Sequence, residues 1–261
     1  MHHGSGTDVP FPVFVINLAR ATERWQAISS RAAELGIALK RVEATDGRMF
    51  AGRTWPDFDE TGFHLRHGRE PLPGEYGCYR SHMDALDAVI ASAGSHALIL
   101  EDDVALPDQL GARLSAIIAL NPAFDLVKLV SHRTTGFVAM ATTRLGDRLG
   151  RTLHGPTGSS AAYLIARSAA PRLREKLGIM QLPYDIALER GWHHGLRMAL
   201  CRPNLVELMP EHGQSDIVDP YSTTQSYRAH RLSLIRRVPT GLFRGSDYLR
   251  RSSYALGGLL R

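Results

Sequence analysis

The sequence lacks long apolar runs, and this absence sets the first limit on the class of protein. No stretch of its 261 residues approaches the roughly 20 apolar residues needed to cross a bilayer. The first residues, Met1 to Gly6, lack the apolar core of a signal peptide and resemble a trimmed affinity tag. We therefore expect a cytoplasmic protein, and we leave these first residues out of the fold argument.

Cysteine is also scarce. The sequence contains only Cys78 and Cys201, which lie far apart and belong to no CxxC pair. This spacing indicates neither a disulfide framework nor a zinc site. We expect two reduced thiols that pack in the interior.

Neither positive nor negative charge dominates the sequence, since the formal net charge is only +5. The charged residues are unevenly distributed along the chain. From Ser226 to Arg261 there are eight arginines and one acid, Asp247, whereas the rest of the chain has 23 basic and 25 acidic residues. This division predicts a folded domain over residues 10–225 with a basic tail over residues 226–261, and it does not indicate nucleic-acid binding. The tail could lie on an anionic membrane surface, where each basic residue contributes about 1 kcal/mol, or it could be a solvated end.

Apolar, β-branched runs alternate with helical patterns along most of the chain. The runs predict strands over residues 13–18, 37–44, 96–100, 125–130 and 161–165, and the patterns predict helices over 22–36, 83–90, 107–120 and 168–177. Residues 48–73 show no period and predict a long loop or a small insertion. The alternation indicates an α/β fold in which helices flank a mainly parallel central sheet.

Three consecutive acids, Glu101, Asp102 and Asp103, follow the buried run that ends at Leu100. In an open α/β sheet, ligands bind beyond the carboxyl ends of the strands, where these acids are expected. Crowded carboxylates repel one another unless a cation neutralises them, and Mg²⁺ or Mn²⁺ binds such groups together with substrate phosphates. The alternative is a solvated acidic turn that precedes a helix.

Two further segments are candidates for ligand contacts. Residues 75–82 place glycines and a capping serine, Ser81, just ahead of the amino end of the expected helix that runs through 83–90, and they place His82 in its first turn. Free N–H groups at such a helix end can receive a phosphate. Residues 157–160, with the sequence Thr-Gly-Ser-Ser, line a sugar or phosphate or form a tight turn. Asp185 follows Pro183 and, taken alone, is a helix cap.

The order of these segments resembles glycosyltransferase family 25, the group of lipooligosaccharide and collagen galactosyltransferases. The resemblance covers roughly 170 residues, which is far more specific than any single motif. The matching pieces are Val15-Ile16-Asn17-Leu18-Ala19-Arg20 with Arg24-Trp25, Glu43-Ala44-Thr45-Asp46-Gly47, Glu75-Tyr76-Gly77-Cys78 with Ser81-His82, Ala97 to Val104, Asp125 to Leu129, and Ala162 to Ile165.

The resemblance implies an A-type glycosyltransferase (Rossmann-like) fold, a UDP-sugar donor, most often UDP-galactose, and inversion at the anomeric carbon. It implies that the acids at 101–103 take the place of the family's Asp-x-Asp motif, with Asp103, and Glu101 or Asp102, as ligands of Mn²⁺ or Mg²⁺. It also implies that residues outside this acidic segment contact the UDP-sugar donor. We assign these contacts to Asn17, Arg20, Arg24, Glu75, Ser81 and His82.

The resemblance further makes Asp185 the candidate base that deprotonates the acceptor hydroxyl, because the family has an acid in a similar Pro-x-Asp context. His212 is either a third metal ligand or, as we favour, a surface histidine. The expected function is hexose transfer to a lipopolysaccharide-type or other glycan acceptor, with the basic tail at the inner membrane face. The rival functions are a metal-dependent phosphohydrolase or nucleotidyltransferase, and a non-catalytic binding module with the same fold.

Overall fold

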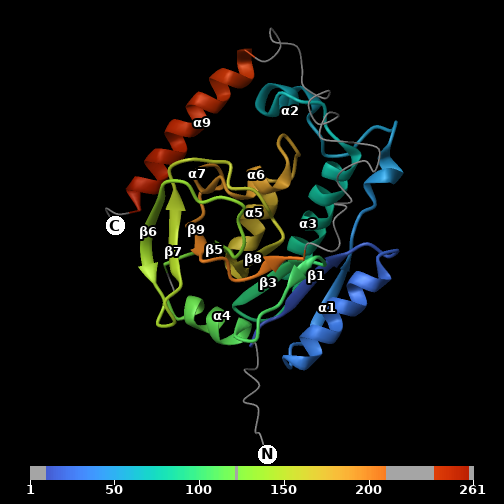
Figure 1. Cartoon of the computed structure of the whole chain (residues 1–261). Coiled ribbons are helices and arrows are strands. Elements are labelled where there is room, and N and C mark those ends of the chain that lie inside the picture. Colours follow the sequence, from blue (N-terminus) through green and yellow to red (C-terminus); the bar gives the residue numbers. More distant parts are fainter. Residues whose placement is uncertain (1–9, 121–122, 210–237, 259–261) are drawn as a thin grey trace, which may run out of the picture.

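The computed structural model describes residues 10–120, 123–209 and 238–258, and it confirms the α/β class. An eight-stranded sheet, ordered β2-β1-β3-β8-β5-β9-β7-β6, forms the centre, and helices cover both of its faces (Figure 1). Its strands are β1 (Val13–Asn17), β2 (Leu39–Glu43), β3 (His96–Glu101), β5 (Leu126–Lys128), β6 (Phe137–Thr142), β7 (Arg148–Thr152), β8 (Ala162–Ala166) and β9 (Met198–Arg202). A small second sheet pairs β4 (Val104–Ala105) with β10 (Glu207–Leu208).

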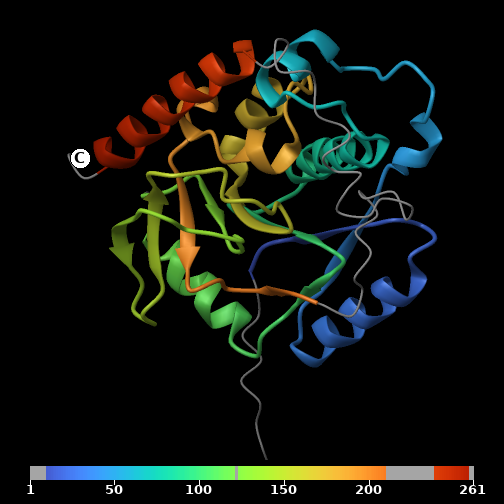
Figure 2. The ribbon, with the colours of Figure 1, turned by 45° about the horizontal axis from the view of Figure 1, so that its top comes forward.

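The helices lie in two layers, one on each face of the sheet (Figure 2). Helices α1 (Thr22–Glu34) and α4 (Leu110–Ile118) cover one face. The other face carries α3 (Pro73–Ala91), α5 (Ala170–Lys176) and α6 (Tyr184–Leu188), with α2 (Glu60–His67), α7 (Gly191–His194) and α9 (Val238–Gly257) farther out. Across the described ranges, no helix combines the length and apolar character that a membrane crossing requires.

Strand β1 shows why both faces of the sheet are buried. Alternate side chains of a strand point to opposite faces. Phe14 and Ile16 pack in the hydrophobic core under α3, whereas Val13 and Val15 pack in the core under α1 and α4. All five residues of β1 are buried, so this strand reads as a continuous apolar run.

The sheet is mixed and not mainly parallel as predicted, because four of its seven strand pairings are antiparallel. Strands β2, β1, β3, β5, β9 and β6 run in one direction. Strands β8 and β7 run the opposite way, so every pairing that they make is antiparallel. The irregular region after residue 132 contains the hairpin of β6 and β7, which was not predicted.

Two further predictions are corrected. Residues 48–73 are not simply a loop, because α2 and a 3-10 turn at Gly47–Phe50 lie there. Helix α3 begins at Pro73, ten residues before the expected start. Ser81 and His82 therefore lie inside a helix, where their N–H groups are used in the helix and cannot receive a phosphate. The glycines at 74 and 77 concealed this early start, because glycine disfavours helices.

Gly47 and Gly77 allow α3 to approach the segment after β2 very closely. A Cβ atom on Gly77 would lie 2.6 Å from Gly47 N and 2.7 Å from Thr45 O, both backbone atoms. A Cβ atom on Gly47 would lie 2.1 Å from Pro73 O. These two glycines therefore allow two segments of backbone to touch. Both segments are among those that resemble the family.

Replacing Gly77 by Ala should destabilise the protein by about 1–3 kcal/mol, because backbone must move to admit the methyl group. Gly245→Ala on α9 is the matched control, since a Cβ there meets nothing within 4 Å. The control should gain about 0.5–1 kcal/mol through helix propensity. Urea unfolding measures both changes, and equal stability of the two variants would contradict the close contact.

The described part of the basic tail is the helix α9, which packs on the domain. Phe243 and Tyr254 pack against the core under α3, and Arg151 Nη1 donates to Tyr254 O at 2.6 Å. On its outer side α9 exposes Val238, Leu242, Leu249 and Leu256. The expected membrane contact of the tail stays a prediction. Residues 210–237, which include His212 and the first part of the tail, lie outside the described residues.

Candidate active site

The order of the first three strands creates a switch point at the carboxyl ends of β1 and β3. The chain passes from β1 to β2 on one side and then returns to β3 on the other side. Strands β1 and β3 are parallel neighbours, with Ile16 opposite Glu101. Asn17 and the three acids therefore meet at the point where open α/β sheets bind their ligands.

A pocket of about 850 Å³ opens beside this switch point. Its acidic side comes from α3, the end of β3, and α6, and carries Glu75, Glu101, Asp103 and Asp185. Of the three consecutive acids, only Glu101 and Asp103 line it. The volume is typical of sites for cofactors and small ligands.

Glu101 is held in place by hydrogen bonds. Ser160 Oγ donates to its Oε1 at 2.9 Å, and His82 Nε2 lies 3.2 Å from the same oxygen. Burial opposes ionisation, but the contacts with His82 and Ser160 hold the pKa of Glu101 below its ordinary value. The carboxylate therefore stays charged at neutral pH.

Asp103 has the opposite environment. Its Oδ1 atom is buried and has no hydrogen-bond partner among the described residues. Burial, followed by repulsion from Glu101 and Asp102, raises the pKa of Asp103 to about 7. A buried carboxylate oxygen without a donor, beside other acids, fits a divalent cation, since a cation would remove both the repulsion and the missing contact.

Asp102 points away from the pocket. Asn17 Nδ2 donates to Asp102 Oδ2, and Arg24 Nε lies 3.3 Å from the same oxygen. Arg20 forms an ion pair with Asp46 instead. These residues lie outside the pocket lining, on the side of the switch point toward α1. Asn17 Oδ1 is buried there without a hydrogen-bond partner in the described chain.

The predicted donor contacts on α3 have structural partners. Glu75 Oε2 accepts a hydrogen bond from Leu72 N at 3.0 Å in the first turn, although Glu75 also lines the pocket. Ser81 Oγ accepts from Thr45 N at 2.9 Å and donates to Gly77 O at 2.7 Å. Ser81 therefore fastens α3 to the loop after β2, on the side of the close glycine contact.

His82 is completely buried in a cluster of tyrosines. Its ring stacks on Tyr184, with centroids 4.1 Å apart, and its Nδ1 lies 3.2 Å from the Tyr163 hydroxyl. Nε2 faces Glu101, so a proton on Nε2 can be donated to this carboxylate. His82 orients Glu101 from behind, as a histidine with two fixed partners can.

Cys78 also faces this site, which the interpretation as a packing thiol missed. It lines the pocket, and its sulfur, a His82 nitrogen and a Glu101 oxygen lie within 4.8 Å of one another, close enough to share a metal ion. Burial raises the pKa of the Cys78 thiol well above its ordinary value, so the thiol is protonated. The sequence contained a signal for this position: Cys78 lies three residues after Glu75 and four before His82, and this spacing places all three on one face of a helix.

Asp185 lies in the first turn of α6 and lines the same pocket. Burial raises its pKa, the positive charge of Lys128 opposes the rise, and the negative charge of Glu189 adds to it. An acid with a raised pKa at a pocket wall can accept a proton from a substrate at neutral pH.

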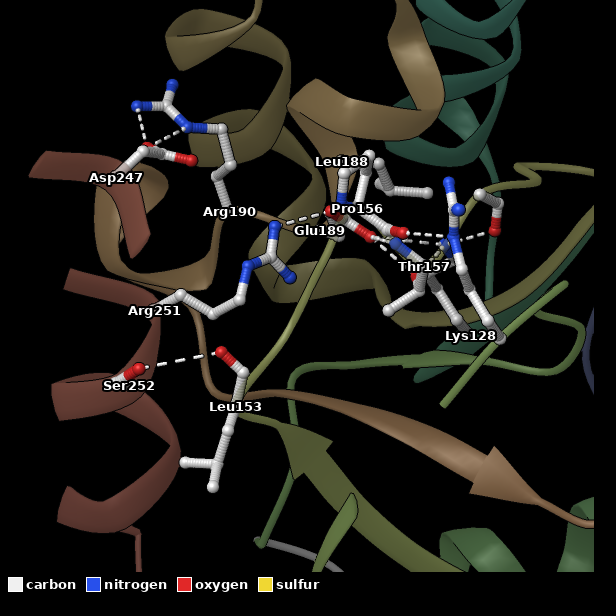
Figure 3. A network of polar contacts seen from close by, with 12 residues as sticks. Lys128, Leu153, Pro156, Thr157, Leu188, Glu189, Arg190, Asp247, Arg251 and Ser252 are labelled. Atoms are coloured by element: carbon white, nitrogen blue, oxygen red, sulfur yellow. Dashed lines mark hydrogen bonds and ion pairs between the residues drawn. The ribbon is translucent and has the colours of Figure 1, made fainter. Parts of the chain in front are cut away.

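Lys128 and Glu189, whose charges act on Asp185, belong to a buried network of charges that Figure 3 shows. Lys128 Nζ donates to Thr157 Oγ1 at 3.0 Å and to Gly158 O at 2.9 Å. Glu189 accepts from Thr157 N at 2.8 Å and pairs with Arg251, which reaches in from α9. The network holds the loop that carries Ser160, and its members come from four distant parts of the chain, so no sequence pattern pointed to it.

The mixed sheet, the switch point and the acidic pocket define an α/β protein with an A-type glycosyltransferase (Rossmann-like) fold. The sequence model of glycosyltransferase family 25, described as LPS biosynthesis protein, matches residues 11–188. The match covers more than half of the chain, and the chain therefore belongs to glycosyltransferase family 25. The matched region contains every site residue discussed above except Glu189 and Arg251.

Curated relatives share a shorter stretch. The probable inactive glycosyltransferase 25 family member 3 of Rattus norvegicus is 31% identical over 110 residues, which are 41% of this chain and 19% of that protein. Procollagen galactosyltransferase 2 of Mus musculus is 30% identical over 110 residues, 41% of this chain and 18% of that protein. The chain thus spans about a fifth of the length of these relatives.

Proposed function

We propose that the protein is an inverting glycosyltransferase that moves a hexose, galactose first among the candidates, from a UDP-sugar to a hydroxyl of a glycan or glycolipid acceptor. The observation that carries the proposal is Asp103, whose Oδ1 has no hydrogen-bond partner among the described residues and whose pKa is raised by burial and by two other carboxylates. This is the environment of a cation ligand at the carboxyl end of a strand.

Asp103 and Glu101 would hold Mn²⁺ or Mg²⁺, and both fit this role because they line the pocket together. The cation would stabilise the negative charge that grows on the diphosphate as the sugar–phosphate bond breaks. Asn17 is buried outside the pocket lining and donates to Asp102, so we propose that it positions the acidic segment behind the donor site. His82 and Ser160 keep Glu101 charged and correctly oriented.

Asp185 is the proposed base, and inversion requires it to act from the face of the sugar opposite the leaving diphosphate. The acceptor hydroxyl would give its proton to the Asp185 carboxylate as the oxygen attacks the anomeric carbon. The raised pKa of Asp185 makes it a better proton acceptor than an ordinary aspartate. Lys128 limits this rise in pKa and so favours the ionised form that a base requires.

A thermal-shift screen with UDP-galactose, UDP-glucose and UDP-N-acetylglucosamine, each with and without Mn²⁺, tests donor binding. We expect the largest rise in Tm from one UDP-sugar combined with Mn²⁺, because binding to the native state stabilises it. Asp185→Asn should keep this rise while lowering kcat for transfer by about 10²–10⁴-fold. Asp108→Asn, at an exposed acid, is the control and should change neither.

A transfer assay, read together with the thermal-shift screen, separates the rival functions. Sugar appearing on an acceptor excludes simple phosphate-ester hydrolysis. A donor-induced rise in Tm without turnover would instead favour a non-catalytic donor-binding protein, a possibility that the names of the inactive relatives raise. If no UDP-sugar changes Tm with or without Mn²⁺, the proposed function is wrong.

A further inference from the structure

One wall of the pocket comes from α9, which lies outside the part of the chain that matches the family. The match ends at residue 188, and α9 spans Val238–Gly257. Phe243, Arg244 and Tyr248 of α9 nevertheless line the same pocket as Glu101 and Asp103. The pocket therefore has a side shared with the family and a side supplied by this helix.

Contacts along its whole length fix α9 against the domain. Thr240 Oγ1 donates to His64 O at 3.2 Å near its start, and the Tyr254 hydroxyl donates to Leu196 O at 2.6 Å near its end. Between them, Arg190 Nη2 pairs with Asp247 at 2.8 Å, and Arg251 pairs with Glu189 (Figure 3). The wall is thus fixed before any ligand binds, which lowers the entropy lost on binding.

The charges of this wall are mainly positive. Arg66, at the end of α2, and Arg133, in the loop after β5, join Arg244 on the pocket lining. Asp247 is already neutralised by Arg190. Burial, and then the positive charges of Arg69 and Arg244, lower the pKa of the neighbouring His67 to about 3, so His67 adds no charge of its own.

Arg66 lies against a ring and Arg133 against a carbonyl, and Asp59 is also near Arg66, since its pKa is lowered by the Gly62 N–H and further by the charge of Arg66. The Arg66 guanidinium lies over the Phe243 ring at 5.8 Å, and Arg133 Nε donates to Pro156 O at 2.9 Å. Within the described ranges, no carboxylate forms an ion pair with either side chain. A guanidinium held by a ring or a carbonyl keeps N–H groups for an anion, and its fork matches phosphate and carboxylate.

Tyr248 adds an aromatic surface to the same wall. Its side chain is 45% exposed although it lines the pocket, and its hydroxyl lies 3.2 Å from His154 Nδ1. Because this contact fixes the ring, one face can pack against the apolar side of a sugar ring. An aromatic ring beside two arginines is suited to a sugar that carries a negative charge.

We propose that α9, with Arg66 and Arg133, forms the acceptor site of this protein and selects an acceptor sugar bearing an anionic group, a phosphate or a carboxylate. This proposal rests on the proposed function, which divides the pocket into a donor site and an acceptor site. The donor diphosphate belongs beside Asp103 at the switch point, and we assign the wall formed by α9, Arg66 and Arg133 to the second substrate. Tyr248 packs on the acceptor ring, and the two arginines bind its charged group.

Calorimetry on the full chain tests the proposal with three probes at millimolar concentrations: glucose, glucose 6-phosphate and glucuronic acid. We expect at least one charged sugar to bind about tenfold or more tightly than glucose. Arg66→Gln and Arg133→Gln should each weaken binding of that sugar about fivefold or more, and leave glucose unchanged. Tyr248→Ala should weaken all three probes.

Arg250→Gln is the matched control, because Arg250 is exposed on α9 but does not line the pocket. A loss of binding in this control equal to that of Arg66→Gln would overturn the proposal, as would equal affinity for charged and neutral sugars or no binding at all. The rise in Tm with UDP-galactose and Mn²⁺ is measured on the same variants. If the arginine variants abolish that rise, the wall belongs to the donor site and the proposal is wrong.

The two proposals fail separately. If UDP-sugars do not bind but charged sugars still require Arg66 and Arg133, the proposed transferase function falls and the anionic sugar site stands. If UDP-sugars bind and are turned over while the charged sugars show no preference, the function stands and the acceptor site falls.

Discussion

Asp103→Asn should abolish sugar transfer and at the same time stabilise the protein in the absence of metal. Transfer should fall by about 10²–10³-fold or more, because the variant loses a ligand for the cation that stabilises the leaving group. Stability should rise because the variant removes a charge that burial, Glu101 and Asp102 disfavour in the folded state. A gain in stability with a loss of activity is typical of a functional site.

The pH dependence of Tm in EDTA checks the cause. The pKa of Asp103 is about 7 in the folded state and near 3.8 when unfolded, so the folded state retains a proton that the unfolded state has lost between these values. Wild-type stability from this group therefore falls as pH rises from about 4 to about 7 and then levels off. The advantage of Asp103→Asn should be small at pH 4 and largest above pH 7, where about 1 kcal/mol corresponds to 2–4 °C.

Saturating Mn²⁺ should reverse the order of stability above pH 7, since only the wild-type protein keeps the full ligand set. Asp108→Asn again serves as the control, because the Asp108 side chain is 86% exposed and its charge is therefore not disfavoured by burial. If Asp103→Asn keeps full transfer activity, or if its stability follows the wild type at every pH, Asp103 is not the ligand.

Glu189→Ala should give the largest loss of stability among the substitutions considered. Its side chain is only 1% exposed and pairs with Arg251, while Lys128 Nζ lies 3.9 Å away. Its removal would leave the buried Arg251 without this ion-pair partner and would take from Lys128 the larger of two nearby negative charges, which costs about 3–5 kcal/mol. Thr157 would also lose the acceptor for its N–H and hydroxyl groups, so the loop that carries Ser160 should loosen.

Urea unfolding measures this loss, and Glu175→Ala, at a side chain that is 74% exposed, is the matched control with an expected change below about 0.5 kcal/mol. Glu189→Gln separates charge from shape, because it keeps an acceptor for Thr157 while removing the negative charge. Its stability should lie between those of the wild type and Glu189→Ala. Equal stability of Glu189→Ala and the Glu175 control would show that the buried network contributes nothing.

The elements that were predicted well are those whose signals are local. The strand over 13–18 and the helix from Thr22 were placed within a few residues, because an apolar run and a helical period are visible in short windows. The start of α3 was missed because Gly74 and Gly77 disfavour a helix, and the close contact with Gly47 explains why Gly77 is there. Tertiary packing overrode local propensity at that point.

The sequence by itself determined the α/β class, the family, and the position of the three consecutive acids after a buried strand. Only the tertiary structure separated those acids, turning Asp102 toward Arg24 while Glu101 and Asp103 face the pocket. It also brought α9 into the pocket wall and joined Lys128 to Glu189 and Arg251. The reason is physical: periodicity reports which side chains a short segment buries, whereas a charge pair between distant segments exists only after the sheet and helices have packed.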